Sequence, residues 1–266
     1  MLTGPRSVRR SVIALSRVLL FWFATMALLA VAGPFAGRGS QAPLIIGALT
    51  VPPTFALTVL FIKWDGKRLS DYRFDITRGS SLRFAAGLLI GFILVAAQTA
   101  LLLLSGVHWR AAPSSSTTVT TAIIGYVLLA TREELAFRGY PLRKLASDCD
   151  PWSAQIVVAA MFVIEHKLGG ATWTNALVGS GLGALVFGMA ALASRGLAFP
   201  IGLHAAWNIG DWARGTKGDG GLWQIVLRPE SSVQFERIAM ASYVAVMSLA
   251  FIGLWQWYRA TRDPHT

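Results

Sequence analysis

Cysteine is nearly absent from this sequence, and charged residues are scarce. Cys149 is the only cysteine, so no internal disulfide can form, and its neighbours Asp148 and Asp150 disfavour a reactive thiolate. Only 14% of the residues are charged, 54% are hydrophobic, and the mean hydropathy is +0.54. The chain is too apolar for an ordinary soluble domain, and we expect a single membrane domain over residues 1–266.

Acidic residues are also few, with 13 Asp and Glu against 24 Lys and Arg, which gives a formal net charge of +11. Such an excess occurs in nucleic-acid-binding proteins, but here the cations are spread through short segments between apolar runs. We see neither a continuous basic face nor an RNA-binding signature, so we expect no nucleic-acid partner. The positive-inside rule of membrane proteins explains the cations better.

Apolar runs of spanning length occur eight times. A hydrocarbon core about 30 Å thick needs roughly 20 helical residues. The expected spans are residues 14–34, 43–62, 84–106, 118–140, 152–168, 173–194, 197–213 and 237–258. The fifth and seventh are short and polar, so we expect them inside the bundle. The predicted fold class is an all-α, polytopic transmembrane helix bundle of about eight spans, which implies a multi-pass protein of the cell membrane.

The first predicted span has one alternative interpretation. Arg6, Arg9 and Arg10 precede it, and Ala30-Val31-Ala32 resembles a signal-peptidase site. The run is long enough to remain as a membrane anchor, however, and further spans follow at once. We therefore expect it to be retained.

Lys and Arg are unequally divided between the two ends of the predicted bundle. One end collects the N-terminus, the 63–83 loop, residues 138–144, Arg195 and the C-terminal tail, and it has more than twice as many cations as the other. The cations of the other end are Arg38, Arg110, Lys167, Arg214, Lys217, Arg228 and Arg237. The positive-inside rule then predicts that both termini are cytoplasmic. The 63–83 loop could lie along the anionic inner leaflet or be solvated, and the sequence favours neither.

Short-range signals predict helix ends and close helix contacts. Asp150-Pro151 is typical of an N-cap followed by proline at the first helical position, and Gly196 is a predicted C-cap. Small residues let helices approach closely, and the sixth span contains Gly179, Gly181, Gly183 and Gly188.

Ionisable residues concentrate in three of the predicted spans. The fourth carries Glu133, Glu134 and Arg138, the fifth carries His166, and the seventh carries His204. Each ionisable group at the centre of a membrane helix costs about 2.5 to 3.5 kcal/mol on insertion scales, so a functional site is the first hypothesis. We treat residues 118–213 as the motif-bearing core.

Helix geometry separates the roles of the two adjacent glutamates. Glu134 precedes Arg138 by four residues, which favours an ion pair on one helix face. Glu133 points about 100° away, has no basic residue one turn further on, and is free to act as a base.

The spacing of the motif residues predicts a shared pocket. Glu133 and His166 are symmetrical about the expected turn at Cys149-Asp150, so an antiparallel hairpin would place both at one depth. His204 and Asn208 are at i and i+4 on one helix face, and Phe162 lies one turn before His166.

Three motifs occur in order along these spans. They read Glu133-Glu134-x-x-x-Arg138, Phe162-x-x-x-His166 and His204-x-x-x-Asn208. In this order the chain resembles the CPBP family of intramembrane endopeptidases, which includes the type II CAAX prenyl proteases and the bacterial Abi proteins. The resemblance covers roughly residues 118–213, and the charged neighbours of His166, Glu165 and Lys167, depart from the family pattern.

The resemblance implies hydrolysis of a peptide bond near the cytoplasmic membrane face. Glu133 with His166 would activate a water, while His204 and Asn208 would stabilise the oxyanion. The supporting residues would be Glu134, Arg138 and Phe162. The implied partners are the lipid bilayer and a membrane-embedded or lipidated peptide or protein substrate, whose identity and cleavage site the sequence does not reveal.

The resemblance leaves the cofactor open, because proteins of this family are often described as metalloproteases. Glu133, His166 and His204 could hold Zn²⁺ with one open position. The sequence has no H-E-x-x-H helix, however, and a metal-free glutamate mechanism is slightly favoured.

Two other classes of function remain open. A non-catalytic membrane scaffold or immunity protein of the same fold would keep the same buried groups for packing. A proton-coupled transporter would also bury Glu and His, but we find no inverted repeat in the sequence.

Overall fold

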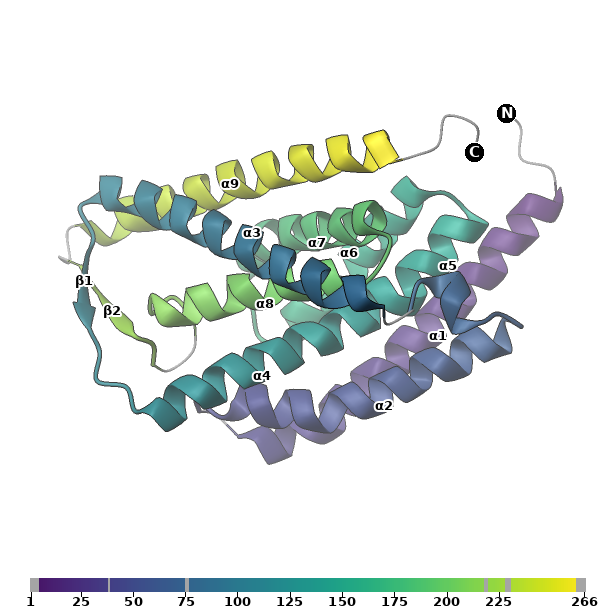
Figure 1. Cartoon of the computed structure of the whole chain (residues 1–266), viewed down its shortest axis with the longest axis horizontal. Coiled ribbons are helices and arrows are strands. Elements are labelled where there is room, and N and C mark those ends of the chain that lie inside the picture. Colours follow the sequence, from purple (N-terminus) through teal and green to yellow (C-terminus); the bar gives the residue numbers. More distant parts are fainter. Residues whose placement is uncertain (1–4, 38, 75–76, 218–219, 228–230, 262–266) are drawn as a thin grey trace.

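The computed structural model describes residues 5–37, 39–74, 77–217, 220–227 and 231–261 (Figure 1). The α-helices are α1 Pro5–Ala36, α2 Ala42–Trp64, α3 Arg78–Leu102, α4 Ser116–Glu134, α5 Tyr140–Asp148, α6 Pro151–Leu168, α7 Gly181–Ser194, α8 Ala198–Ala213 and α9 Ser232–Thr261. Two 3-10 turns, η1 Leu69–Tyr72 and η2 Leu103–Ser105, flank α3, and the π-helical turns η3 Leu135–Gly139 and η4 Asn175–Ser180 join α4 to α5 and lead into α7. All eight predicted spans are therefore helical.

Five helices in the described chain are long and apolar enough to cross a membrane. They are α1, α2, α3, α7 together with η4, and α9. The three other predicted spans correspond to α4, α6 and α8, which are shorter and carry the ionisable residues. The structure thus supports a membrane-spanning helix bundle with five candidate spans, and eight crossings stay a prediction.

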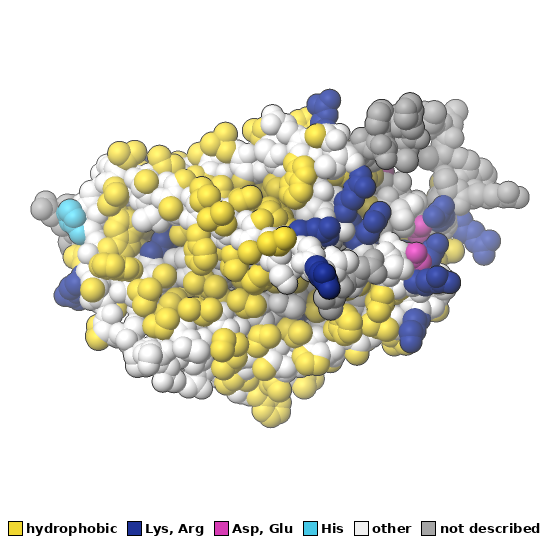
Figure 2. All heavy atoms as spheres, in the orientation of Figure 1, with side chains coloured by type: hydrophobic (Ala, Val, Ile, Leu, Met, Phe, Trp, Pro, Cys, Tyr) yellow, Lys and Arg dark blue, Asp and Glu magenta, His cyan; other side chains and the backbone are white. Residues whose placement is uncertain are grey.

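Helices α4 and α5 continue in one direction through η3 and the other successive helices run antiparallel, so the start of α1 and the end of α9 lie at the same end (Figure 1). Figure 2 shows Lys and Arg side chains gathered toward that end, with apolar side chains over much of the visible face. We call it the basic end; it comprises the starts of α1 and α3, the α5–α6 turn, Arg195 and the end of α9. Arg38, Arg228, Arg262, the rest of the C-terminal tail and the side chain of Arg6 were all used for the orientation prediction and lie outside the description.

The opposite end carries a two-stranded antiparallel sheet that the sequence analysis did not predict. Strands β1 (His108–Ala111) and β2 (Trp223–Val226) pair there, and we call it the hairpin end (Figure 1). The indole of Trp109 donates a hydrogen bond of 3.0 Å to the carbonyl of Arg214. The sheet therefore holds the segment that follows α8 against the connection before α4.

Helices α3 and α8 approach each other closely because glycines face the opposing backbone. A Cβ added at Gly87 would lie 2.1 Å from the carbonyl oxygen of Phe199, and one at Gly202 would lie 2.2 Å from that of Phe84. In α7, Gly188 likewise has no room for a Cβ beside Gln155. Gly181 and Gly183 have tight contacts as well, whereas a Cβ at Gly179, the fourth glycine predicted to permit close contact, would meet nothing within 4 Å.

The helix-end predictions had different outcomes. The N-cap at Asp150 is confirmed, because its carboxylate accepts hydrogen bonds from the backbone amides of Trp152 and Ser153 at 2.8 and 3.0 Å. The C-cap prediction at Gly196 is wrong by one residue. Arg195 adopts the left-handed conformation after α7, with φ of 53°.

Candidate active site

Helices α4, α6 and α8 bring the predicted site residues to one cavity of about 330 Å³. Its lining includes Glu133 from α4, His166 from α6, and His204 and Asn208 from α8. Glu133, His204 and Asn208 are buried, and His166 is half-buried. The four side chains thus line one cavity, although His204 lies closer in sequence to the turn before its helix than Glu133 and His166 lie to theirs.

Glu134 and Arg138 hold His204 from behind. Arg138 donates to Glu134 Oε1 at 3.3 Å, as the i, i+4 spacing predicted, although the π-helical turn η3 lies between the two residues. The same carboxylate oxygen lies 2.9 Å from His204 Nδ1. A carboxylate oxygen can only accept, so Nδ1 carries a hydrogen and the other ring nitrogen, Nε2, points away from Glu134.

Glu133 lies on the other side of the same imidazole. Its Oε2 is 3.5 Å from His204 Nε2. Because Nδ1 donates to Glu134, Nε2 is the ring nitrogen that faces Glu133, and a proton on Nε2 would be directed at that carboxylate. His204 rather than His166 is thus the imidazole in contact with Glu133, which differs from the arrangement that the resemblance implied.

Aromatic rings surround the buried charges. The ring of Phe187 stacks on His204 at 4.2 Å between centroids with an interplanar angle of 13°. The guanidinium carbon of Arg138 lies 4.8 Å from the ring centre of Phe162 and 5.8 Å from that of Phe187. These contacts stabilise a cation that water cannot reach, and they restrict the rotation of the imidazole.

His166 lines the cavity, and no hydrogen bond joins it to Glu133 among the described residues. Its Nδ1 lies 3.0 Å from the backbone carbonyl oxygen of Phe162, and the two rings lie 4.2 Å apart between centroids. A carbonyl oxygen accepts a hydrogen bond from Nδ1–H, which in the neutral ring leaves Nε2 as an acceptor for a molecule in the cavity.

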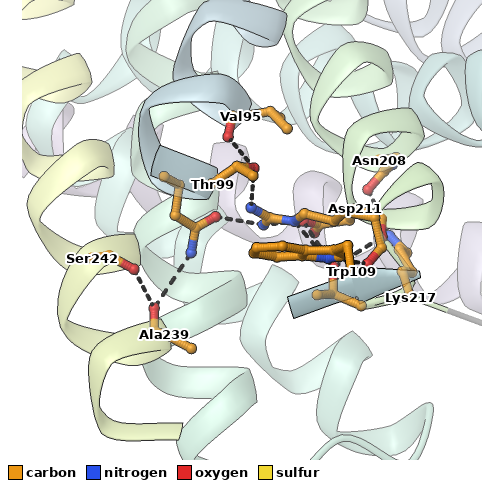
Figure 3. Close-up of polar contacts among 11 residues, drawn as sticks. Val95, Thr99, Trp109, Asn208, Asp211, Lys217, Ala239 and Ser242 are labelled. Atoms are coloured by element: carbon orange, nitrogen blue, oxygen red, sulfur yellow. Dashed lines mark hydrogen bonds and ion pairs between the residues drawn. The ribbon is translucent and has the colours of Figure 1, made fainter. Parts of the chain in front are cut away.

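Asn208 is oriented by a residue that the motifs do not contain. Lys217, in the segment after α8, donates to Asn208 Oδ1 at 2.6 Å (Figure 3). An ammonium group can only donate, so this contact assigns the amide oxygen and leaves Nδ2 as the donor on the other side. Nδ2 is buried and has no hydrogen-bond partner in the described chain.

Arg132 and Glu165 form a buried ion pair next to the site. The two side chains bond through both carboxylate oxygens, the longer contact being 3.4 Å. Glu165, one of the two neighbours of His166 that depart from the family pattern, is thus neutralised by Arg132 of α4. The separation of 33 residues is the same as that between Glu133 and His166, and this spacing was the signal that the sequence analysis missed.

The match to a known family falls on the same helices. Residues 114–210 match the family described as type II CAAX prenyl endopeptidase, Rce1-like. This central segment is similar to that family. The match begins just before α4 and ends within α8, so it contains all three motifs and confirms the resemblance, while α1, α2, α3 and α9 lie outside it. No curated protein matches the chain.

The zinc site predicted for the motif-bearing core requires Glu133, His166 and His204 to lie together. Among the described residues, no group of three or more His, Cys, Asp and Glu side chains is arranged so that it could hold a metal ion. Glu133 and His204 are adjacent, but His204 Nδ1 is occupied by Glu134, and His166 is not gathered with them. The arrangement of Glu133, His166 and His204 therefore does not fit the predicted zinc site.

The cavity of this core reaches the hairpin end of the bundle. Its lining includes Ala171 and Asn175 from the connection after α6, and Thr216 and Lys217 from the segment after α8. A neighbouring cavity of about 830 Å³ shares Asn175 and Thr216 and extends to β2 and the start of α9. Neither lining includes a residue from the connections at the basic end.

Proposed function

We propose that the chain is an intramembrane endopeptidase in which Glu133 activates a water for attack on a peptide bond. The observation that carries the proposal is the position of Glu133 and His204, 3.5 Å apart, in a cavity that also contains the unpaired amide nitrogen of Asn208. A base, an imidazole and a buried amide donor around one space are the groups that acyl hydrolysis requires. The family match supports the same class of reaction.

In the proposed reaction the water oxygen attacks the carbonyl carbon while Glu133 accepts one proton of the water. His166, across the cavity, would orient that water through its free Nε2. The negative charge on the carbonyl oxygen would be stabilised by N–H groups of Asn208 Nδ2 and of protonated His204 Nε2. Glu133 then returns the proton to the amine nitrogen as the C–N bond breaks, so that protons balance.

The support residues would act without touching the substrate. Glu134 fixes the tautomer of His204, Arg138 neutralises Glu134, and Phe162 covers the guanidinium group. The reaction as proposed includes no step through a metal. Zinc held by Glu133, His166 and His204 is the alternative, and metal analysis of the purified protein distinguishes the two.

The proposed substrate is a membrane-embedded or lipidated peptide or protein at the cell membrane, since the cavity lies inside a helix bundle of membrane-spanning length. The sequence analysis placed hydrolysis near the cytoplasmic face together with both termini. The cavity reaches the hairpin end, whereas α1 starts and α9 ends at the basic end. Hydrolysis and the two termini are therefore expected on opposite sides of the membrane. Hydrolysis takes place on the side that the hairpin end faces.

The test of the function replaces Glu133 with Gln. The matched control is Asp71→Asn, which makes the same carboxylate-to-amide change on an exposed residue of η1. Membrane peptides of cells with wild-type and variant protein are compared by mass spectrometry. We expect peptides that depend on the protein to disappear with Glu133→Gln and to remain with Asp71→Asn; identical peptides in all three samples would favour a scaffold or immunity protein.

A further inference from the structure

A separate cavity of about 660 Å³ lies at the basic end, between α3, the end of α7 and the end of α9. Its lining residues are Arg73, Thr77, Arg83, Ala193, Ser194, Arg195, Trp257 and Thr261. Three of them are arginines from three separate elements, several others carry hydroxyl groups, and none is acidic. The cavity is therefore strongly basic.

The carboxylates described at this end are engaged elsewhere. Asp65 pairs with Arg17 and Lys144, and Asp148 pairs with Arg10 and Lys144. The arginines of the cavity have no ion pair with any described carboxylate. Their positive charge is thus not neutralised by the part of the protein that the structure describes.

The hydrogen-bonding capacity of these arginines is largely unused. Arg195 donates one hydrogen bond to the carbonyl of Thr261. Arg73 and Arg83 make no side-chain hydrogen bond to another described residue. A guanidinium group has five N–H donors, so most of the donors around the cavity are available to an anion.

Backbone conformation marks two of the same arginines. Arg73 and Arg195, with φ of 60° and 53°, are the non-glycine residues of the described chain with positive φ. This region favours glycine or asparagine, and Gly196 lies directly beside Arg195. Both unfavourable positions carry arginine and both line one cavity, which indicates that the side chains have a use there.

A fourth arginine adds to the positive charge. Burial, followed by the charge of Arg73, lowers the pKa of Arg143 in α5 to about 10. Like charges raise each other's free energy, so an anion bound near Arg73 would relieve the repulsion.

The surroundings of the cavity indicate the source of the anion. Trp257, which lines it, is 38% exposed, and tryptophan is enriched at the level of lipid headgroups. Leu82 precedes Arg83 and is 75% exposed, and Leu89, two turns further along α3, is 62% exposed. The basic cavity therefore adjoins an apolar helix surface suited to acyl chains.

We propose that this cavity binds the phosphate headgroup of an anionic phospholipid, with Arg73, Arg83 and Arg195 as donors and the acyl chains along α3. Guanidinium groups bind phosphate oxygens through paired, charge-assisted hydrogen bonds. Basic pockets between membrane helices are recurrent sites for anionic headgroups. The site is independent of the proposed peptide hydrolysis.

The experiment measures lipid binding to the purified full-length protein in detergent by native mass spectrometry, with phosphatidylglycerol and phosphatidylcholine as probes. The variants are Arg83→Gln and Arg195→Gly, and the matched control is Arg78→Gln, which removes the same charge from an exposed position of α3 outside the lining. We expect wild type and Arg78→Gln to retain phosphatidylglycerol selectively. Both test variants should bind it about tenfold more weakly, in line with the loss of a charge-assisted contact.

Arg195→Gly also separates binding from folding. Glycine suits the left-handed backbone, so the lipid-free thermal stability of this variant should equal or exceed that of wild type while lipid binding falls. A third arm adds inorganic phosphate as a competitor. Full displacement of phosphatidylglycerol by phosphate at equal concentration, equal weakening by Arg78→Gln, or no preference for phosphatidylglycerol over phosphatidylcholine would overturn the proposal.

Discussion

Asn208 illustrates how one side chain outside the motifs determines what a motif residue can do. Lys217 occupies the amide oxygen, so only the amide nitrogen can serve the cavity. Asp in place of Asn keeps the size and the contact to Lys217 but removes the donor. We expect Asn208→Asp to lower kcat about 10²- to 10³-fold with little change in KM, as for loss of one oxyanion donor.

The measurement is the rate of cleavage of a peptide bond that the Glu133→Gln comparison has identified, with purified protein. Lys217→Arg is the control, since it retains a cationic donor for the amide oxygen. A normal rate for Asn208→Asp would exclude the amide nitrogen as an oxyanion donor.

Whether Arg132 and Glu165 stabilise the fold as a direct buried ion pair can be tested by removing one or both charges. Removing either partner leaves an uncompensated charge, so Arg132→Met and Glu165→Met should each lower the free energy of unfolding by about 3 to 5 kcal/mol. The double variant should recover most of this loss. Thermal unfolding in detergent gives the comparison, and additive losses in the double variant would contradict a direct pair.

The residue identities were easier to predict from sequence than their contacts. Spacing at i, i+4 was enough for Glu134 with Arg138, because one helix carries both residues. The choice between His166 and His204 as the neighbour of Glu133 depends on how α6 and α8 are rotated about their axes, which the motifs do not contain. The role of Lys217 depends on the path of the chain after α8, for which the sequence had no periodic signal.

At the level of elements, the packing of α3 against α8 controls the position of the site. Gly87→Ala would bring a Cβ within 2.1 Å of the Phe199 carbonyl and force α8 away from α3. Overpacking of this kind costs about 1 to 3 kcal/mol, and here it would also displace His204 and Asn208. We expect Gly87→Ala to lose peptide cleavage along with some stability.

The control for this prediction is Gly253→Ala in α9, where an added Cβ would meet nothing within 4 Å. Both variants remove glycine from a membrane-spanning helix and gain the same helix propensity. Activity and thermal unfolding are measured side by side. Equal behaviour of the two variants would mean that the close approach of α3 and α8 is not needed for the site.

The elements themselves follow from sequence to different degrees. Long apolar runs predicted every helical pass, because burial in lipid requires internally bonded helices. The π-helical turn η3 depends on Arg138 reaching Glu134 and the Ala184 carbonyl inside the bundle, which is tertiary information. Strands β1 and β2 pair although 112 positions of sequence separate Ala111 from Trp223, so no local pattern predicts the sheet.

 The register pairs His108 with Val226 and Ala111 with Trp223, and helices α4 to α8 lie between the two strands in the sequence.

For the molecule as a whole, the unequal division of charge and the position of the cavity together predict on which side of the membrane the proposed hydrolysis would take place. The Lys and Arg side chains gather at the basic end (Figure 2), which the positive-inside rule assigns to the cytoplasm. The cavity with Glu133 reaches the hairpin end instead. The sequence analysis could not show this, because it had no information on which end of the bundle the pocket opens toward.

The single cysteine provides the test of orientation. Cys149 is exposed in the turn between α5 and α6 at the basic end, so it reports that end without any engineering. The counterpart is Asn175→Cys in a Cys149→Ser background, which places the only thiol beside the cavity at the hairpin end. With a membrane-impermeant maleimide on intact cells, we expect Asn175→Cys to be labelled and Cys149 to be labelled only after permeabilisation. The reverse pattern would place the basic end outside, contrary to the charge rule, and would return hydrolysis to the cytoplasmic face.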